Sequence, residues 1–146
     1  MREIISAIGQ KHKATGITLR PPASSQQIQD FEKRIGFELP ADFREFYSVC
    51  NGFECEEDIF QVMSLEDILE YGYKHGNNGF HFAEYMTFCD VWSLRKVSDG
   101  QFEIFNRGEV EVVLTSSLYE FLQRFLKGNV FEEGGLYDWR DELKAT

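Results

Sequence analysis

Residues 24–53 read SSQQIQDFEKRIGFELPADFREFYSVCNGF, and this stretch contains two consecutive helical patterns. Ser24 or Ser25 can accept backbone N–H bonds as the N-cap of the first helix. The residues Ile28, Phe31 and Ile35 then recur at the spacing of one apolar helical face. Gly36 suits the left-handed position that often follows a last helical turn. The stretch therefore predicts a first helix that ends near Ile35.

The second helix is expected to begin near Pro40, because the missing N–H of proline costs nothing in a first helical turn. Its apolar stripe consists of Phe43, Phe46, Tyr47 and Cys50. Asn51-Gly52 is expected to end this helix, since both residues tolerate a positive φ.

Shorter apolar segments flank these two helices. Ile4, Ile5 and Ile8 indicate an amphipathic helix at the beginning of the chain, which Pro21-Pro22 prevents from continuing. Residues 60–63 form a short apolar run that is typical of a strand. Ser64 is expected to cap a third helix. The inward residues of that helix are Leu65, Ile68 and Leu69.

From Met86 onward the apolar period changes to two, which is typical of strands. One face of the first strand is predicted to carry Met86, Phe88, Asp90, Trp92 and Leu94. Asp99-Gly100 is a hairpin signal, and Asn106-Arg107-Gly108 marks a second turn. The later strands alternate through Phe102 and Ile104, and then through Val110, Val112 and Leu114. Three consecutive strands joined by tight turns predict an antiparallel meander.

The last part of the chain is helical again. Ser117-Leu118-Tyr119-Glu120 matches the S-x-x-E capping box. The apolar residues of the helix that follows are Leu118, Phe121, Leu122, Phe125 and Leu126, and Gly128 closes it. A final helical segment is expected over residues 136–143. We therefore predict an α+β fold in which helices pack against an antiparallel, meander-containing sheet.

The composition indicates one acidic domain. The chain has 146 residues, with 15 Lys and Arg against 25 Asp and Glu, and a net charge of −10. A single domain is predicted over residues 1–146, with residues 1–20 as an N-terminal helical extension and residues 129–146 as a C-terminal extension. Residues 54–94 hold nine acids and one base, Lys74, for a net charge of −8. This acidity argues against direct nucleic-acid binding and against an anionic membrane, and it permits a basic partner.

The chain carries no targeting signal in this interpretation. Residues 1–8 lack the apolar run of a signal peptide, and no stretch approaches the roughly 18 apolar residues of a membrane helix. The three cysteines Cys50, Cys55 and Cys89 form no C-x-x-C pair, and an odd count disfavours a disulfide scaffold. These features predict a reducing compartment, the cytoplasm.

The spacing of residues 24–52 resembles the N-terminal signature of the SUKH superfamily, which contains bacterial toxin-immunity proteins and fungal cell-wall assembly regulators. The matching residues are Ile28, Phe31-Glu32, Ile35-Gly36, Leu39-Pro40, Asp42-Phe43, Phe46-Tyr47 and Asn51-Gly52. The later order is similar as well: an apolar strand, a helix after Ser64, paired strands around Trp92 and a final helix from Leu118. The resemblance covers most of the chain from residue 20 onward.

The resemblance implies a non-enzymatic α+β domain that binds another protein. Many members of the family neutralise a secreted or contact-delivered toxin, often a nuclease, in the cytoplasm, and the family has no accepted catalytic function. We therefore expect an immunity protein that binds a cognate toxin. A housekeeping regulatory module of the cell-wall regulator type is the alternative. The resemblance specifies no particular toxin and no oligomeric state.

Two groups of residues are candidates for contact with a partner. The acids Glu54, Glu56, Glu57 and Asp58 can meet a basic surface, and a solvated loop is the alternative interpretation. The aromatic residues Tyr71, Tyr73, Tyr85 and Trp92 can anchor an interface, and the sheet core is the alternative for them. The signature residues within 28–52 are interpreted as core and as helix punctuation.

The sequence predicts no catalytic, cofactor-binding or metal site. His75, His81 and Cys89 are spaced unlike the common zinc patterns. None of the cysteines combines a nearby base with the positive surroundings that a reactive thiolate prefers. No glycine motif that binds phosphate is present. The enzymatic alternatives are a hydrolase that uses paired carboxylates and a metal site at Glu56-Glu57-Asp58.

Overall fold

Residues 1–145, which the computed structural model describes, form one seven-stranded sheet with helices packed on it. The strands are β1 (Ile17–Leu19), β2 (Phe53–Cys55), β3 (Phe60–Val62), β4 (Gly79–Tyr85), β5 (Asp90–Ser98), β6 (Gln101–Asn106) and β7 (Val112–Thr115). The helices are α1 (Arg2–Lys11), α2 (Ser25–Ile35), α3 (Ala41–Val49), α4 (Leu65–Asp67), α5 (Leu118–Gly128) and α6 (Leu136–Lys144). A π-helical turn, η1 (Ile68–Gly72), continues α4. The predicted α+β fold is confirmed.

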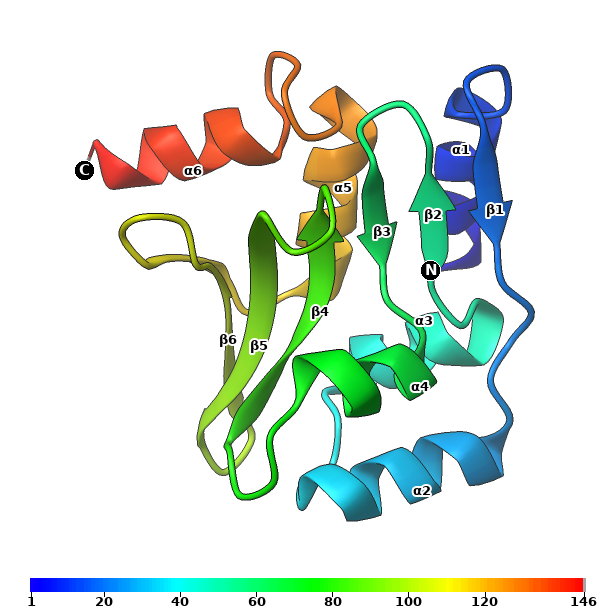
Figure 1. The fold of residues 1–146 in the computed structure, drawn as a ribbon, viewed down its shortest axis with the longest axis vertical. Helices are drawn as coiled ribbons and strands as arrows, with labels where there is room; N and C mark the ends of the chain where they lie inside the picture. Colours follow the sequence, from blue (N-terminus) through cyan, green and yellow to red (C-terminus); the bar gives the residue numbers. More distant parts are fainter. Residues whose placement is uncertain (146) are drawn as a thin grey trace.

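The strands lie in the sheet in chain order, and every neighbouring pair is antiparallel. The helices α2 and α3 lie in the connection between β1 and β2, and α4 lies between β3 and β4. Figure 1 shows α1 and α5 behind the strands, α2, α3 and α4 at one end of the sheet, and α6 at the other end. The face opposite to α1 and α5 is therefore largely free of helices.

The helix limits follow the capping signals in the sequence. The Ser24 hydroxyl accepts the N–H of Gln27 at 3.1 Å, and the Gln27 side chain accepts the N–H of Ser24 at 2.7 Å. This reciprocal pair is a capping box at the start of α2. Gly36 ends the same helix with a φ of 84°. The Ser117 hydroxyl accepts the N–H of Glu120 at 3.1 Å at the start of α5.

Asn51 joins the end of α3 to the start of α4. Its side-chain oxygen accepts the N–H of Leu65 at 2.9 Å, and its side-chain nitrogen donates to the Glu66 carboxylate at 3.1 Å. The next residue, Gly52, has a φ of 86°, and a Cβ there would collide with the Val62 carbonyl oxygen. Only glycine fits this position without a backbone shift. The Asn51-Gly52 pair thus has a structural role.

Aromatic rings form the centre of the core. Phe60 stacks on Phe125 with 4.4 Å between the ring centroids. The indole of Trp92 lies edge-on to Phe60 at 5.7 Å and to Phe121 at 6.2 Å, and Phe82 packs on Phe121 at 5.2 Å. Each such pair contributes about 0.5–1.5 kcal/mol beyond the burial of apolar area. Because these rings come from β3, β4, β5 and α5, they fix α5 against the sheet.

Both predicted extensions contribute side chains to this core. Helix α1 buries Ile4, Ile5 and Ile8, and α6 buries Leu136 and Trp139. All of these side chains belong to the same contiguous cluster of buried residues as Trp92. Residues 1–20 and 129–145 are therefore parts of the packed structure.

One predicted strand is wrong at its beginning. The sequence analysis placed Met86 and Phe88 on a strand face together with Trp92, whereas a turn separates β4 from β5 at this point. Met86, Thr87 and Phe88 lie in that turn with φ values of 53°, 53° and 65°. Non-glycine residues rarely adopt this left-handed conformation, so the sequence carries no local signal for the turn. Val110, also predicted in a strand, precedes β7.

Leu136→Ala should lower the free energy of unfolding by about 2–5 kcal/mol, because it removes a buried side chain from the contact between α6 and the core. Urea denaturation followed by circular dichroism measures this change. The exposed Lys144 on the same helix provides a control, since Lys144→Ala should change stability by less than about 0.5 kcal/mol. A loss below about 1 kcal/mol for Leu136→Ala would contradict the packing role of α6.

Candidate functional site

The open face of the sheet is formed by residues that alternate with core residues along each strand. Phe53 of β2 and Phe60 of β3 are buried in the core, whereas Glu54 and Gln61 point to the other side. Glu54 lies directly opposite Gln61, and Gln61 lies directly opposite Glu84 of β4. A polar row therefore crosses three neighbouring strands on the face away from α1 and α5.

Hydrogen bonds connect this polar row from one side to the other. The Arg20 guanidinium donates to the Glu54 carboxylate at 3.0 Å and to the Gln61 side-chain oxygen at 3.2 Å. The Gln61 side-chain nitrogen donates to one oxygen of Glu84 at 2.6 Å, and the backbone N–H of Phe88 donates to the other at 2.6 Å. Hydrogen bonds to charged groups contribute roughly 1.5–3 kcal/mol each. The row thus links the residue after β1 to the β4–β5 turn.

Glu84 holds the β4–β5 turn in place. Its side chain is buried at 6% exposure, so its carboxylate depends on the two hydrogen bonds that it accepts. The turn contains three left-handed residues, and such backbone conformations cost about 1–3 kcal/mol each. A further bond, from the N–H of Met86 to the carbonyl oxygen of Ile59 at 2.9 Å, joins this turn to the β2–β3 turn. Tertiary contacts therefore maintain a backbone shape that the local sequence disfavours.

Two of the four predicted acids, Glu54 and Asp58, already have partners within the chain, and Glu57 lies near a buried histidine that pairs with it only when the imidazole is protonated. Glu54 is paired within the polar row. A carboxylate oxygen of Glu57 lies 3.5 Å from Nδ1 of the buried His12. Asp58 is half-buried and accepts the backbone N–H of Val130 at 3.1 Å, so it holds the connection between α5 and α6.

Glu56 differs from these three acids. It is exposed in the turn that follows β2, and no residue between 1 and 145 forms an ion pair with it. Its N–H donates to the Gly16 carbonyl oxygen at 3.0 Å, and a Cβ at Gly16 would collide with its carboxylate. Glu56 is therefore held against the neighbouring chain while its charge stays uncompensated, which makes it the predicted acid most available to a partner.

Three of the predicted aromatic residues reach the surface to different extents. Tyr71 is 60% exposed on η1. Tyr73 is half-buried, and its hydroxyl accepts the backbone N–H of Gly76 at 3.2 Å. Tyr85 is half-buried against Phe131, with 4.9 Å between the ring centroids. Of these three, only Tyr71 presents most of its side chain to solvent.

The expectation that Trp92 contacts a partner is wrong. Its exposure is 0%, and its ring is enclosed by Phe60, Phe121 and Tyr137. The register of β4 and β5 turns this side chain toward the helices. A fully buried indole cannot touch a partner while the chain is folded.

The residues that lie beside Tyr71 were not among the predicted site residues. The Phe88 ring is 6.3 Å from the Tyr71 ring, and 41% of the Phe88 residue surface is exposed. Met86 and Ile59 are 46% and 57% exposed in the adjoining turns. Glu84, which holds this arrangement, is a single acid in a strand and matches no motif. Only the pairing of β3, β4 and β5 brings these residues together, so no short pattern could have identified them.

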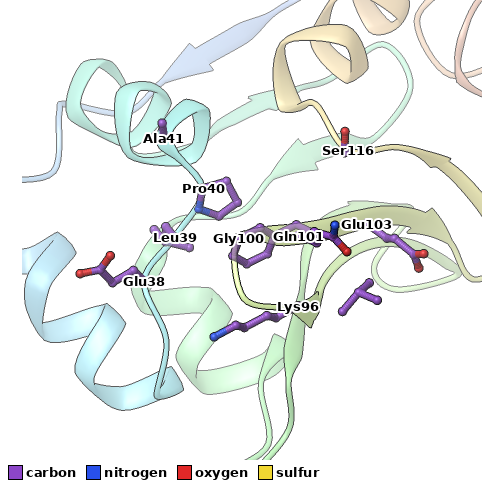
Figure 2. Close-up of a pocket in the computed structure, with 11 residues that line it drawn as sticks. Glu38, Leu39, Pro40, Ala41, Lys96, Gly100, Gln101, Glu103 and Ser116 are labelled. Carbon is purple, nitrogen blue, oxygen red and sulfur yellow. The ribbon is translucent and has the colours of Figure 1, made fainter.

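A hollow of about 750 Å³ lies between the α2–α3 connection and the β5–β6 hairpin. Figure 2 shows the Leu39-Pro40 segment facing the hairpin that carries Lys96 and Glu103. Lys96 pairs with Asp99 at 3.2 Å. Glu103 pairs with Arg95 at 2.9 Å. Both of these charged side chains in the hollow are therefore engaged in ion pairs with neighbouring residues.

A second hollow, of about 760 Å³, lies on the open face beside Tyr71 and Phe88. His81 and Arg107 also line it. Nδ1 of His81 lies 2.5 Å from the Ser93 hydroxyl, and burial together with nearby Arg107 lowers the pKa of His81. The imidazole is therefore neutral at pH 7 and is oriented by a hydrogen bond. Such a group can accept or donate one hydrogen bond to a bound surface.

Across residues 1–145, no group of three or more His, Cys, Asp and Glu side chains is placed to hold a metal ion. His75, His81 and Cys89 are therefore not assembled into such a group. No helix in the same range is long and apolar enough to cross a membrane.

The three thiols have different environments. Cys50 is buried, and burial raises the pKa of its thiol to about 11. Burial, with the charges of Asp58 and Glu57 nearby, raises the pKa of Cys55 to about 12. Cys89 is exposed in the β4–β5 turn. Because the thiolate is the reactive form, Cys50 and Cys55 are protected both by burial and by protonation.

Native protein at pH 8 should therefore release one equivalent of thionitrobenzoate rapidly from Ellman's reagent, because only Cys89 is exposed. Cys89→Ser should remove this fast phase, and unfolding in guanidinium should reveal all three thiols of the unsubstituted chain. A second fast-reacting thiol in the native protein would show that Cys50 or Cys55 is accessible.

A family model places this chain among known proteins. The model of the SMI1 / KNR4 family (SUKH-1) matches residues 22–124, which include the polar row and the β4–β5 turn. The uncharacterized protein YnaB of Bacillus subtilis (strain 168) is 42% identical over 52 residues, or 36% of this chain. That match covers 35% of YnaB, so it spans about a third of the relative's length. The family model covers most of the chain and confirms the resemblance to the SUKH superfamily: this chain belongs to the SMI1 / KNR4 family (SUKH-1).

Proposed function

We propose that this chain is an immunity protein of the cytoplasm, a non-enzymatic domain that neutralises a cognate toxin by binding to it directly. Membership of the SUKH-1 family supports a protein-binding role. The observation that carries the proposal is the open sheet face, which combines the unpaired Glu56 with the exposed rings of Tyr71 and Phe88. Exposed aromatic anchors beside uncompensated charges are typical of protein interfaces.

The charge of this region supports a basic partner. Residues 54–94 carry a net charge of −8 within a chain of −10. A nuclease toxin fits this charge, because an enzyme that binds a polyanion must present a positive surface. Complementary charges increase the rate of association and make it sensitive to salt. The acids would thus guide the toxin to the face on which the aromatic residues hold it.

The proposal is tested by co-expressing the chain with the candidate toxin gene from its genomic neighbourhood. The chain should restore growth, and affinity purification at moderate salt should recover the toxin as a complex. Recovery of wall-synthesis or signalling proteins of the same cell, without rescue by the chain, would favour a housekeeping module of the cell-wall regulator type. That outcome would overturn the immunity proposal.

Charge reversal tests which acids guide the toxin. The double substitution Glu56→Lys and Glu57→Lys should slow association with the toxin by about tenfold at low salt, and the difference should shrink at high salt. Asp58 is left unchanged because it holds the α5–α6 connection. Stopped-flow fluorescence measures the rates.

A matched control separates local from overall charge. Asp30→Lys with Glu45→Lys changes the net charge by the same amount on the exposed surfaces of α2 and α3. This control should slow association less than the variant at Glu56 and Glu57. Equal slowing by both variants would mean that overall charge, and not this surface, guides the partner.

A further inference from the structure

Four exposed apolar side chains lie on or beside the β4–β5 turn. Ile59, Tyr71, Met86 and Phe88 are 57%, 60%, 46% and 41% exposed, and together they are called the apolar turn patch. The rings of Tyr71 and Phe88 are 6.3 Å apart. The backbones of Ile59 and Met86 are joined by a hydrogen bond of 2.9 Å. The patch thus consists of a ring pair and a pair joined through the backbone, and the β4–β5 turn, which carries both Met86 and Phe88, connects the two pairs.

Two of the three segments have an unfavourable backbone conformation, and the third has a rare one. Ile59 has a φ of 50°, and Met86, Thr87 and Phe88 have φ values between 53° and 65°. The left-handed region is a marked outlier for β-branched residues such as Ile59 and Thr87. Tyr71 lies in a π-helical turn. This form is rare in proteins, and where it occurs it is often found at functional sites. Backbone strain of this kind clusters where a protein binds or acts.

Contacts beneath the patch keep these backbones rigid. The Glu84 carboxylate fixes the N–H of Phe88, and Gln61 fixes Glu84 in turn. Gly72 lies so close to β4 that a Cβ there would be 2.6 Å from the His81 carbonyl oxygen, which sets Tyr71 beside the turn. A surface that is rigid before binding loses less conformational entropy when it binds. The patch is therefore preorganised.

Carboxylates border the patch on the side of Ile59 and Tyr71. Glu56 and Glu57 lie in the same turn as Ile59. Glu70 lies next to Tyr71, and its charge raises the pKa of the Tyr71 hydroxyl. On the other side, the basic residues Arg107, Arg140 and Lys144 line the hollow that Tyr71 and Phe88 also border. A second copy of the chain is disfavoured because two molecules that each carry a net charge of −10 repel each other. The acids beside Ile59 and Tyr71 also disfavour an anionic membrane.

We propose that the apolar turn patch is the anchor of the interface, and that its occupant is a protein with an apolar pocket bordered by Lys or Arg side chains. Phe88 and Met86 enter the pocket, and the basic border meets Glu56, Glu57 and Glu70. This inference rests on the proposed function and deepens it. It assigns most of the binding energy to the β4–β5 turn, and it assigns the faster association with a basic partner to the acids beside that turn. Interfaces concentrate their binding energy in a few such anchors.

Photo-crosslinking in the native cell tests the location. p-Benzoylphenylalanine is introduced at Thr87, in the centre of the patch, and as a control at Tyr119 in the first turn of α5, which is exposed to 43%. The toxin is supplied in both strains. The crosslink to the toxin should form from position 87 and not from position 119.

Binding measurements with the purified toxin test the energetic role. Phe88→Ser should weaken affinity by at least about 30-fold, mainly through faster dissociation, as expected for an interface anchor. Tyr119→Ser, at a site of matched exposure, should change affinity less than twofold. Glu84→Ala leaves all four patch side chains in place and releases the turn, so it should weaken affinity by about tenfold through lost preorganisation. Urea midpoints establish that each variant is folded.

The outcomes separate this inference from the proposed function. Rescue of growth with a crosslink from position 119 alone, or with unchanged affinity in both Phe88→Ser and Glu84→Ala, overturns the anchor while the immunity role stands. A crosslink from position 87 to a second copy or to lipid overturns the assigned occupant. A chain that neither rescues growth nor crosslinks from either position overturns both proposals.

Discussion

One buried carboxylate, that of Glu84, determines how the exposed part of the molecule is shaped. Its two oxygens accept hydrogen bonds from Gln61 and from the backbone of Phe88, each at 2.6 Å. Without these bonds nothing local would keep three consecutive non-glycine residues in the left-handed region. The surface that Met86 and Phe88 present therefore depends on a buried residue that a partner cannot contact.

The position of Glu84 follows in turn from the topology of the sheet. Because the strands pair in chain order, Glu54, Gln61 and Glu84 stand side by side on the open face. The same pairing turns Trp92 toward α5, where its ring packs against Phe121. The aromatic core thus sets the register, and the register sets the polar row. The arrangement of polar residues on the open face is therefore a consequence of packing on the other face.

Features with local signals could be predicted from the sequence. Ser24 and Gly36 limit α2 through their own backbone and hydrogen-bonding preferences, which need no tertiary contact. The turn at Met86–Phe88 has no such signal, because it is stabilised by Glu84. Met86 and Phe88 continue the alternation of β5, so the sequence pattern placed them in that strand. Only the pairing of whole strands shows that they lie in a turn and are exposed.

The candidate site, too, could be predicted from the sequence only in part. The high density of acids in the sequence indicated the region around Glu56. The sequence does not distinguish Glu56 from Asp58, whose carboxylate accepts a hydrogen bond from the backbone N–H of the distant Val130. Likewise Tyr71 and Trp92 look equivalent as aromatic residues, and their exposures are 60% and 0%. Long-range contacts determine which acids lack a partner within the chain and which aromatic residues are exposed. Composition therefore indicates a region of the sequence, and only the folded structure shows which of its residues are accessible.

The most direct test of the account is native-state hydrogen exchange of the Phe88 amide, followed by NMR. If Glu84 holds the turn, this amide should exchange as slowly as the paired amides of β4 and β5, although it lies in an exposed turn. Exchange at the rate of an open, solvated turn would contradict the account, because the patch would then have no fixed shape for a partner to bind.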